Sequence, residues 1–248
     1  MLKYVSASQI KTFRRCPRLW VYEKFVRKTK TPSTKAQEFG TNVHEELEEY
    51  LTTGAKPKLL SSQALVTDLP YGLLTKGILT EVAVSKYSLL MRPLSKVVLS
   101  NYTLAGYPVS GFIDVWTTTG VEDFKTTKDL RYSLKAEELL TDVQMMIYAD
   151  VFLTAHPTLT ECTVTHRNVT RSLRSPKSRV VSVPVSRSHV AEQIEDIEHT
   201  VRKMADTLSQ YREERNVHLV DDNGRTGCYA YGPCYFLKRG FSSSRINL

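Results

Sequence analysis

Residues 111–125, which read GFIDVWTTTGVEDFK, constrain the fold of this chain more than any other stretch. An apolar and aromatic run is followed by Thr and Gly turn residues and then by a second β-prone run, a pattern that predicts a hairpin of two strands. Because side chains alternate between the faces of a strand, Asp123 and Lys125 share one face while Phe124 points to the other, toward a core. Asp114 on the partner strand is placed to face the charged pair.

Two carboxylates and an ammonium group on otherwise apolar strands allow two interpretations. Buried charges must meet a cation or one another, and a hard divalent metal would satisfy Asp114 and Asp123 while it left Lys125 available for chemistry. Alternatively, the hairpin is a solvated sheet edge with a surface ion pair. The hairpin alone does not decide between these interpretations.

Composition limits the class of protein. Mean hydropathy of -0.29 and 24% charged residues describe a globular chain, and 248 residues suffice for one large domain or two small ones. The formal charge of +8 fits a polyanionic partner. No apolar run approaches the ~18 residues of a membrane helix and the N-terminus has no signal-peptide pattern, so we expect a cytoplasmic protein without membrane contact. Its four cysteines should then be thiols or metal ligands.

The early segment 8–28 has a helical apolar pattern that is interrupted at Cys16-Pro17, which predicts helix, break, helix. Basic residues alternate there with aromatic ones, a combination that suits the phosphates and bases of a nucleic-acid strand. The other interpretation is an amphipathic helix whose aromatic residues are core. The candidate nucleic-acid contacts are Arg14, Arg15, Arg18, Trp20, Tyr22 and Lys24.

Further elements are predicted from periodicity and turn signals. A helix over 35–51, closed by Thr-Thr-Gly, contains His44. Considered alone, a histidine on a helix is more often a structural or exposed residue than a metal ligand. A helix over 134–153 places Gln144 and Tyr148 on one face, where a solvent-facing pair is the simpler interpretation. The remaining predictions are strands at 78–87, which carries Glu81, at 96–104, at 161–170 and at 179–185, and a long helix at 189–215.

The order of these features resembles the RecB-type branch of the PD-(D/E)xK nuclease superfamily. The five matching segments are FGTNVH, TEVAV, GFID, EDFKT and QMMIYA, over residues 39–149. The opening SASQIKTFRRCPRLWVYEKF also resembles the usual N-terminal segment of that family, so the resemblance covers nearly the whole chain. Within that family, the chain is similar to small viral or phage-encoded nucleases akin to the CRISPR adaptation nuclease.

This resemblance implies an α/β fold with a restriction-endonuclease-like core, in which helices flank a central mixed β-sheet. It implies one nuclease domain over 1–248, with a core at about 35–190 and with segments 1–34 and 216–248 packed together beside the active site. The implied function is a metal-dependent DNA nuclease of recombination, repair or phage DNA processing. A threaded DNA end would make it an exonuclease, on single strands or duplex ends, that works with a recombination protein or helicase.

The resemblance also assigns roles to individual residues. Mg²⁺ or Mn²⁺ is held by His44, Asp114, Asp123 and the backbone carbonyl of Phe124, while Glu81 acts directly or through water. We expect Lys125 to act as a cation, because a lysine with a pKa near 10.4 is almost never neutral at pH 7. Gln144 and Tyr148 would orient Lys125 or the DNA strand. The alternatives are a catalytically idle nucleic-acid-binding protein, in which one Asp or Lys is usually lost, and a scaffold for an acidic partner.

Several relatives of this kind hold a [4Fe-4S] cluster with one early and three late cysteines. Cys16, Cys228 and Cys234 match three of these positions, but Arg239, Gly240 and Phe241 stand where the fourth would be. Cys162 lies in a predicted strand and is a poor replacement. Three thiolates leave either an open iron site or no cluster, in which case the thiols pack as small apolar groups. A zinc site lacks the same fourth ligand.

Overall fold

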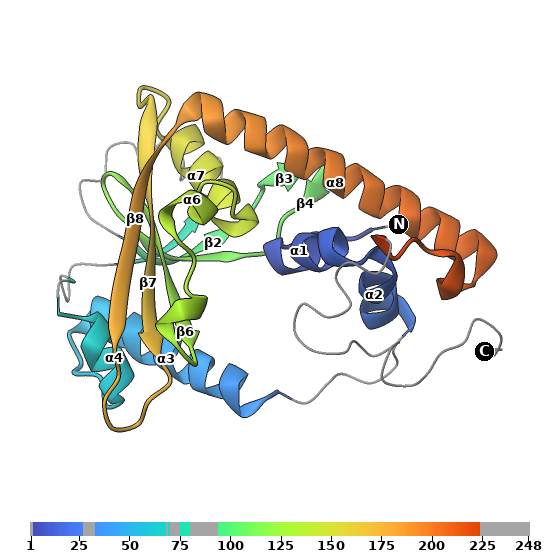
Figure 1. Cartoon of the computed structure of the whole chain (residues 1–248). Helices are drawn as coiled ribbons and strands as arrows, with labels where there is room; N and C mark the ends of the chain where they lie inside the picture. Colours follow the sequence, from blue (N-terminus) through green and yellow to red (C-terminus); the bar gives the residue numbers. More distant parts are fainter. Residues whose placement is uncertain (1, 27–32, 68, 70–74, 80–93, 224–248) are drawn as a thin grey trace.

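The computed structural model describes residues 2–26, 33–67, 69, 75–79 and 94–223. Its centre is a six-stranded mixed sheet with helices on both faces (Figure 1), which confirms the expected α/β class. The strand order is β1-β2-β5-β6-β7-β8, with parallel pairing in β1–β2 and β6–β7. These strands are β1 Thr75–Leu79, β2 Leu94–Leu99, β5 Phe112–Trp116, β6 Gly120–Thr127, β7 Glu161–Thr170 and β8 Ser178–Ser186, and a separate ribbon pairs β3 Thr103–Leu104 with β4 Tyr107–Pro108.

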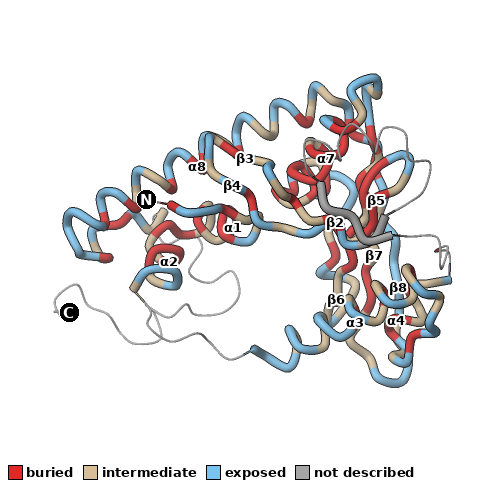
Figure 2. The backbone as a smooth tube through the Cα atoms, turned by 180° about the vertical axis from the view of Figure 1, so that it is seen from behind, coloured by how far each residue is buried: buried red, intermediate tan, exposed pale blue. Residues whose placement is uncertain are grey.

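Two hydrophobic cores lie on opposite faces of the sheet. Helices α7, α8, α1 and α2 contribute to the larger core, whereas α3 packs the smaller one against β5, β6 and β7. Figure 2 shows that many of the buried residues lie in the sheet and in α7. The helices are α1 Ala7–Arg15, α2 Pro17–Val21, the π-helix η1 Tyr22–Val26, α3 Lys35–Thr53, α4 Leu60–Leu65, η2 Leu130–Tyr132, α6 Ala136–Leu139, α7 Val143–Ala155, α8 Arg187–Glu214 and η3 Val217–Leu219.

The predicted hairpin is present as β5 and β6. Its described ladder contains two residue pairs, Val115 with Glu122 and Trp116 with Val121, beyond which the strands part. Gly120 opens β6 beside β7, where a Cβ atom would lie 1.8 Å from the carbonyl oxygen of Thr163. Only glycine permits so close a backbone approach, so this residue fixes the start of the parallel β6–β7 pairing.

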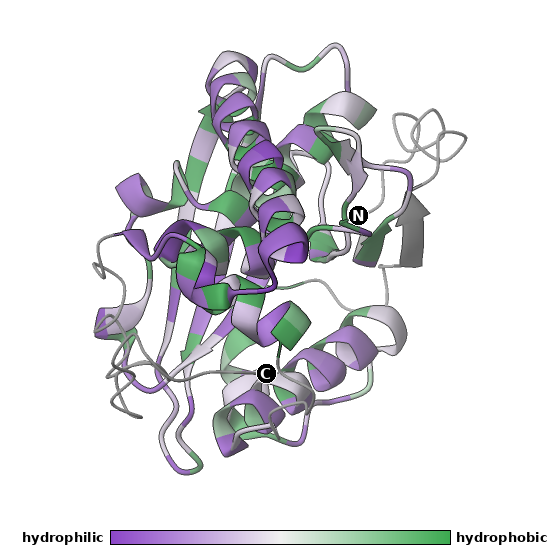
Figure 3. Cartoon of the chain, turned by 90° about the vertical axis from the view of Figure 1, so that its right-hand side faces the viewer, coloured by the Kyte–Doolittle hydropathy of each residue, from purple (hydrophilic) through white to green (hydrophobic). Residues whose placement is uncertain are grey.

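Most predicted helices form, with ends set by their caps. Thr34 and Gln37 make a reciprocal capping box at the start of α3, and Gly54 ends it with a left-handed φ of 80°. Helix α8 covers the expected 189–215 region, and Figure 3 shows hydrophilic residues along its outer side. The break predicted at Cys16-Pro17 separates α1 from α2. No helix among the described residues is long and apolar enough to cross a membrane.

Two predicted elements were wrong in extent. The single helix expected over 134–153 is two helices, α6 and α7, because Asp142 adopts an extended conformation and caps α7. The strand expected over 96–104 ends at Leu99, and Asn101 turns the chain with a φ of 64° before β3 begins. Of the strand expected over 78–87, residues 78 and 79 lie in β1, and Glu81 lies outside the described residues.

Candidate active site

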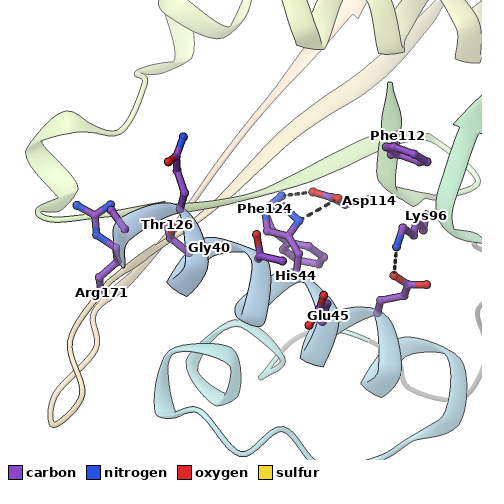
Figure 4. A pocket seen from close by; sticks show the side chains of 13 residues that line it. Gly40, His44, Glu45, Lys96, Phe112, Asp114, Phe124, Thr126 and Arg171 are labelled. Atoms are coloured by element: carbon purple, nitrogen blue, oxygen red, sulfur yellow. Dashed lines mark hydrogen bonds and ion pairs between the residues drawn. The ribbon is translucent and has the colours of Figure 1, made fainter. Parts of the chain in front are cut away.

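The candidate site lies where β5 and β6 part. One carboxylate oxygen of Asp114, Oδ2, accepts a hydrogen bond of 2.8 Å from the backbone N–H of Phe124, and the other, Oδ1, lies 3.1 Å from Nδ1 of His44 on α3. The imidazole also meets the Phe124 ring edge-on, with 6.0 Å between centroids. Asp114 therefore ties together β5, β6 and α3, and His44 is brought to the site as predicted (Figure 4).

Asp123 and Lys125 face α7, opposite to Phe124, as the strand alternation predicts. The Lys125 ammonium lies 2.5 Å from Oδ2 of Asp123 and donates to Oε1 of Gln144 at 2.9 Å. The amide of Gln144 donates to Oδ1 of Asp123 and to the hydroxyl of Tyr148, each at 2.8 Å. That hydroxyl donates to the carbonyl of Phe112 on β5. The Gln-x-x-x-Tyr pair thus points inward, and the solvent-facing interpretation was wrong.

Gln144 owes its position to the start of α7. Oδ1 of Asp142 accepts hydrogen bonds from the backbone N–H groups of Gln144 and Met145, at 3.0 and 3.1 Å. Oδ2 of the same carboxylate pairs with the ammonium of Lys11 on α1, at 2.6 Å. Asp142, which the sequence analysis did not single out, therefore couples the N-terminal helix to the glutamine that contacts the charged pair.

The electrostatics of the site follow from burial and from three close charges. Asp123 is 2% exposed, and burial raises the pKa of its carboxyl to about 6 although Lys125 acts in the opposite direction. For Lys125, burial acts to lower the pKa, but the carboxylates of Asp123 and Asp114 outweigh it and raise the pKa above its usual value. Burial likewise opposes ionisation of His44, but its bond to Asp114 leaves the pKa raised.

His166 is a site neighbour that the sequence analysis missed. It lies on β7 directly beside Asp123 in the parallel ladder, is 2% exposed, and places Nε2 3.9 Å from Oδ2 of Asp123. Burial and the Lys125 charge lower the pKa of its imidazole to about 4, so it is neutral at pH 7. Neither ring nitrogen has a hydrogen-bond partner within the described part of the chain. Knowledge of the β6–β7 register would have identified it.

A cleft of about 740 Å³ opens over Asp114. It runs between α3 and the sheet, from Lys96, which pairs with Glu48 at 2.7 Å, to Arg171 at the opposite end (Figure 4). The remaining lining residues are Ala36, Gln37, Gly40, Thr41, His44, Glu45, Phe112, Phe124 and Thr126.

The carboxylate oxygens of Asp114 and Asp123 are of the type that a hard divalent cation prefers. Asp114 and His44 meet at the cleft, and Oδ2 of the buried Asp123 accepts no well-directed hydrogen bond, although the Lys125 ammonium is close. Among the described residues, no three His, Cys, Asp or Glu side chains converge as a preformed metal cluster. Glu81 lies outside those residues, so its part in the site stays a prediction.

The basic N-terminal segment is tied to the C-terminal part of the chain. Arg14 donates to Asp196 and Thr200 on α8, at 2.7 and 3.0 Å, and Arg18 pairs with Asp222 at 3.0 Å. Trp20 is fully buried, which agrees with the core interpretation for this residue. Of the other candidates, Lys24 is exposed, and Arg15 and Tyr22 are partly buried. These side chains are not brought to the Asp114 cleft.

The described residues include two of the four cysteines, so the cysteine predictions are tested only in part. Cys16 is buried and caps α2, where its sulfur accepts from the backbone N–H of Leu19 at 3.4 Å. Cys228 and Cys234 lie outside the described residues. Cys162 is buried in β7, and burial raises the pKa of its thiol to about 12, so it remains a protonated core residue. Both alternatives, an open iron site and no cluster, therefore stay untested.

Comparison with known proteins gives a similar fold and a family. A solved structure from Eubacterium rectale, named a "putative exonuclease", shares the fold with a TM-score of 0.56 and 12% identity, over 99% of this chain and 91% of that one. No curated protein sequence matches the chain. The family model of the PD-(D/E)XK nuclease superfamily matches residues 4–234. Because that match spans nearly the whole chain and includes both carboxylates and the lysine of the candidate site, the chain belongs to the PD-(D/E)XK nuclease superfamily.

Proposed function

We propose that the chain is a divalent-metal-dependent nuclease that hydrolyses phosphodiester bonds in DNA. The observation that carries this proposal is the Lys125 ammonium, held between the Asp123 carboxylate and the Gln144 amide. Lys125 follows Phe124, which lines the Asp114 cleft, in the same strand. An idle relative of the family would have no need to keep this lysine charged beside two carboxylates. Membership of the superfamily supports the same reaction class.

The proposed metal ligands are His44, Asp114, Asp123 and the carbonyl of Phe124, for Mg²⁺ or Mn²⁺. Such an ion, when bound, polarises a phosphate oxygen and lowers the pKa of a coordinated water. The two carboxylates would offset the charge of such an ion, Asp123 from its place beside Lys125. Glu81 is proposed as a further ligand, directly or through water.

Lys125 is proposed to act as a fixed cation rather than as a base. Its pKa lies above the usual value because the neighbouring carboxylates outweigh burial, so the amine keeps its proton at neutral pH. Its side chain is 36% exposed, so it is not sealed from solvent. A cation in this place stabilises the negative charge that grows on the phosphate oxygens as the nucleophile attacks.

Gln144 and Tyr148 are proposed to position that cation. Gln144 accepts from Lys125 with its carbonyl and donates to Asp123 with its amide, so the two charged groups cannot rotate independently. The hydroxyl of Tyr148 accepts a hydrogen bond from this amide. The same hydroxyl donates to the carbonyl of Phe112, which fixes it to β5. Neither residue needs to exchange a proton with the substrate in this scheme.

We further propose that the enzyme acts on DNA ends, as an exonuclease in recombination, repair or phage DNA processing. Two observations support this. The structural neighbour from Eubacterium rectale carries an exonuclease name. The N-terminal helix is also linked to the site through the pair of Lys11 and Asp142, so this segment can restrict access from one side.

The test is cleavage of end-labelled single-stranded and linear duplex DNA with Mg²⁺, Mn²⁺ or EDTA. Wild type and Lys125→Met are compared, because methionine keeps the length of the side chain without its charge. We expect metal-dependent cleavage by wild type and a loss of at least about 1,000-fold in the variant, on the scale of one lost electrostatic stabiliser. Absence of cleavage by folded wild type under all conditions would instead favour a nucleic-acid-binding protein without activity.

A further inference from the structure

A second hollow, of about 440 Å³, adjoins the active-site cleft. It lies between the segment that follows β6 and the turn that joins β7 to β8, and we call it the hairpin groove. Arg171 lines both the cleft and the groove, so the two adjoin at this residue. The lining of the groove consists of Lys128, Asp129, Leu130, Arg131, Thr170, Arg171, Ser172, Ser175, Lys177 and Arg179.

The groove is strongly basic. Five of its lining residues are Lys or Arg, and the carboxylate among them, Asp129, already accepts from its neighbour Arg131 at 3.1 Å. Lys128, Arg131, Lys177 and Arg179 are all exposed. Like charges gathered this closely repel one another, so their arrangement along a hollow fits a polyanionic ligand. The simpler alternative is a solvated basic turn, and the position of the groove next to the cleft at Arg171 favours a ligand site instead.

Hydrogen bonds hold these residues on a defined frame. The backbone N–H of Arg171 donates to the carbonyl of Thr127 at the end of β6, at 2.8 Å, and that of Lys177 donates to Oγ1 of Thr170, at 2.9 Å. Arg179 reaches across to the carbonyl of Leu130 at 3.3 Å. The groove is thereby fixed to the strand that carries Asp123 and Lys125. Three residues of extended chain place Lys128 about 10 Å beyond Lys125.

We propose that the hairpin groove binds the phosphates of the substrate strand on one side of the bond to be cut. The inference rests on the proposed nuclease function in that the bound strand is taken to be the one that reaches Asp114. Arg171 guides the strand from cleft to groove, and the four exposed cations contact successive phosphates. Tyr132 is 71% exposed next to Arg131 and offers an aromatic face to a base of this strand.

Binding is tested separately from cleavage, in EDTA, by the anisotropy of a fluorescein-labelled 20-nucleotide single strand over a range of salt concentrations. The groove variant is Lys128→Glu/Lys177→Glu. Its matched control is Lys203→Glu/Arg212→Glu, with the same charge change on exposed positions of α8. We expect the groove variant to bind at least 10-fold more weakly. Its log–log salt slope should be smaller by about 1.4, because each phosphate contact on a single strand contributes about 0.7.

Hydrolysis of the small ester thymidine 5′-phosphate p-nitrophenyl ester provides the second readout. It fits within the cleft, so the groove variant should hydrolyse it at the wild-type rate while it cleaves the 20-mer more slowly. Equal affinity and salt slope for the groove and control variants would refute phosphate binding in the hairpin groove, even if cleavage by wild type is robust. Groove-dependent binding without any cleavage by wild type would uphold the groove and refute the proposed nuclease function.

Discussion

The carboxylate of Asp114 accepts a hydrogen bond from the backbone N–H of Phe124 at the point where β5 and β6 part. In a continuous ladder that N–H would meet a carbonyl of the partner strand. A side chain here takes the place of the backbone acceptor, so a proposed metal ligand also closes the end of the hairpin. The site is therefore built into the sheet, and its residues carry structural as well as chemical roles.

Replacement of Asp114 should separate these two roles. Asp114→Ala removes the acceptor and is expected to lower the free energy of unfolding by about 1–3 kcal/mol, the usual cost of an unsatisfied buried donor. Asp114→Asn keeps an acceptor oxygen and should lose less than half as much. Urea denaturation in EDTA measures both, and equal losses would contradict a structural role for the oxygen. Both variants should lack cleavage activity.

The buried carboxyl of Asp123 predicts an unusual pH dependence of stability without metal. Its pKa is about 3.8 in the unfolded chain and about 6 in the folded protein, so between these values the folded state holds the extra proton. Stability should therefore fall by about 3 kcal/mol as pH rises from about 4 to about 6, since each pKa unit corresponds to 1.36 kcal/mol. Urea titrations in EDTA across this range measure the effect.

Asp123→Asn is the control for that titration, because it removes the titrating group and leaves the other carboxyls in place. Its stability curve should lack the fall between pH 4 and 6. Parallel curves for the two proteins would contradict the assignment of the raised pKa to this residue.

The N-cap of α7 should matter for both stability and catalysis. Asp142→Ala removes the acceptor for two backbone N–H groups and is expected to cost about 1 kcal/mol, with a further loss from the Lys11 pair. Because the cap fixes Gln144, cleavage should slow by about 10-fold. Lys11→Ala, which breaks the pair but keeps the cap, should change stability less and serves as the comparison in thermal unfolding.

Cys162 should be unreactive in the folded protein. Burial raises the pKa of its thiol to about 12, so its thiolate is scarce at pH 8. Labelling with Ellman's reagent should modify Cys162 only when guanidinium is added, whereas Cys162→Ala should leave iron content after anaerobic purification unchanged. Loss of bound iron in this variant would identify Cys162 as a cluster ligand.

The sequence predicts the local part of the site well. Alternation along β6 places Asp123 and Lys125 together, and four-residue spacing places Gln144 above Tyr148, because these relations depend only on strand and helix periods. The contacts of the N-terminal arginines were harder to predict, since the partners of Arg14 and Arg18 lie about 180–200 residues away in the chain. Local patterns carry no signal for such contacts.

The same limit explains what was missed. His166 enters the site only through the register of a parallel pair, which turn geometry does not set because a crossover connects the strands. The helix break at Asp142 was missed because apolar periodicity continues across it, from Leu139 to Val143. The hairpin groove requires the turn after β7 to lie against the segment after β6, an arrangement fixed by tertiary structure.

The two cores on opposite faces of the sheet give the site two independent supports. His44 comes from α3 on the smaller core, whereas Gln144 and Tyr148 come from α7 in the larger one. Local opening usually begins where the fewest apolar contacts must be lost. Amide hydrogens of α3 should therefore exchange sooner than those of α7, and His44 should leave Asp114 in brief excursions that spare the Asp123–Lys125–Gln144 network. Access of a ligand to Asp114 would then depend on the stability of α3 and not on that of α7.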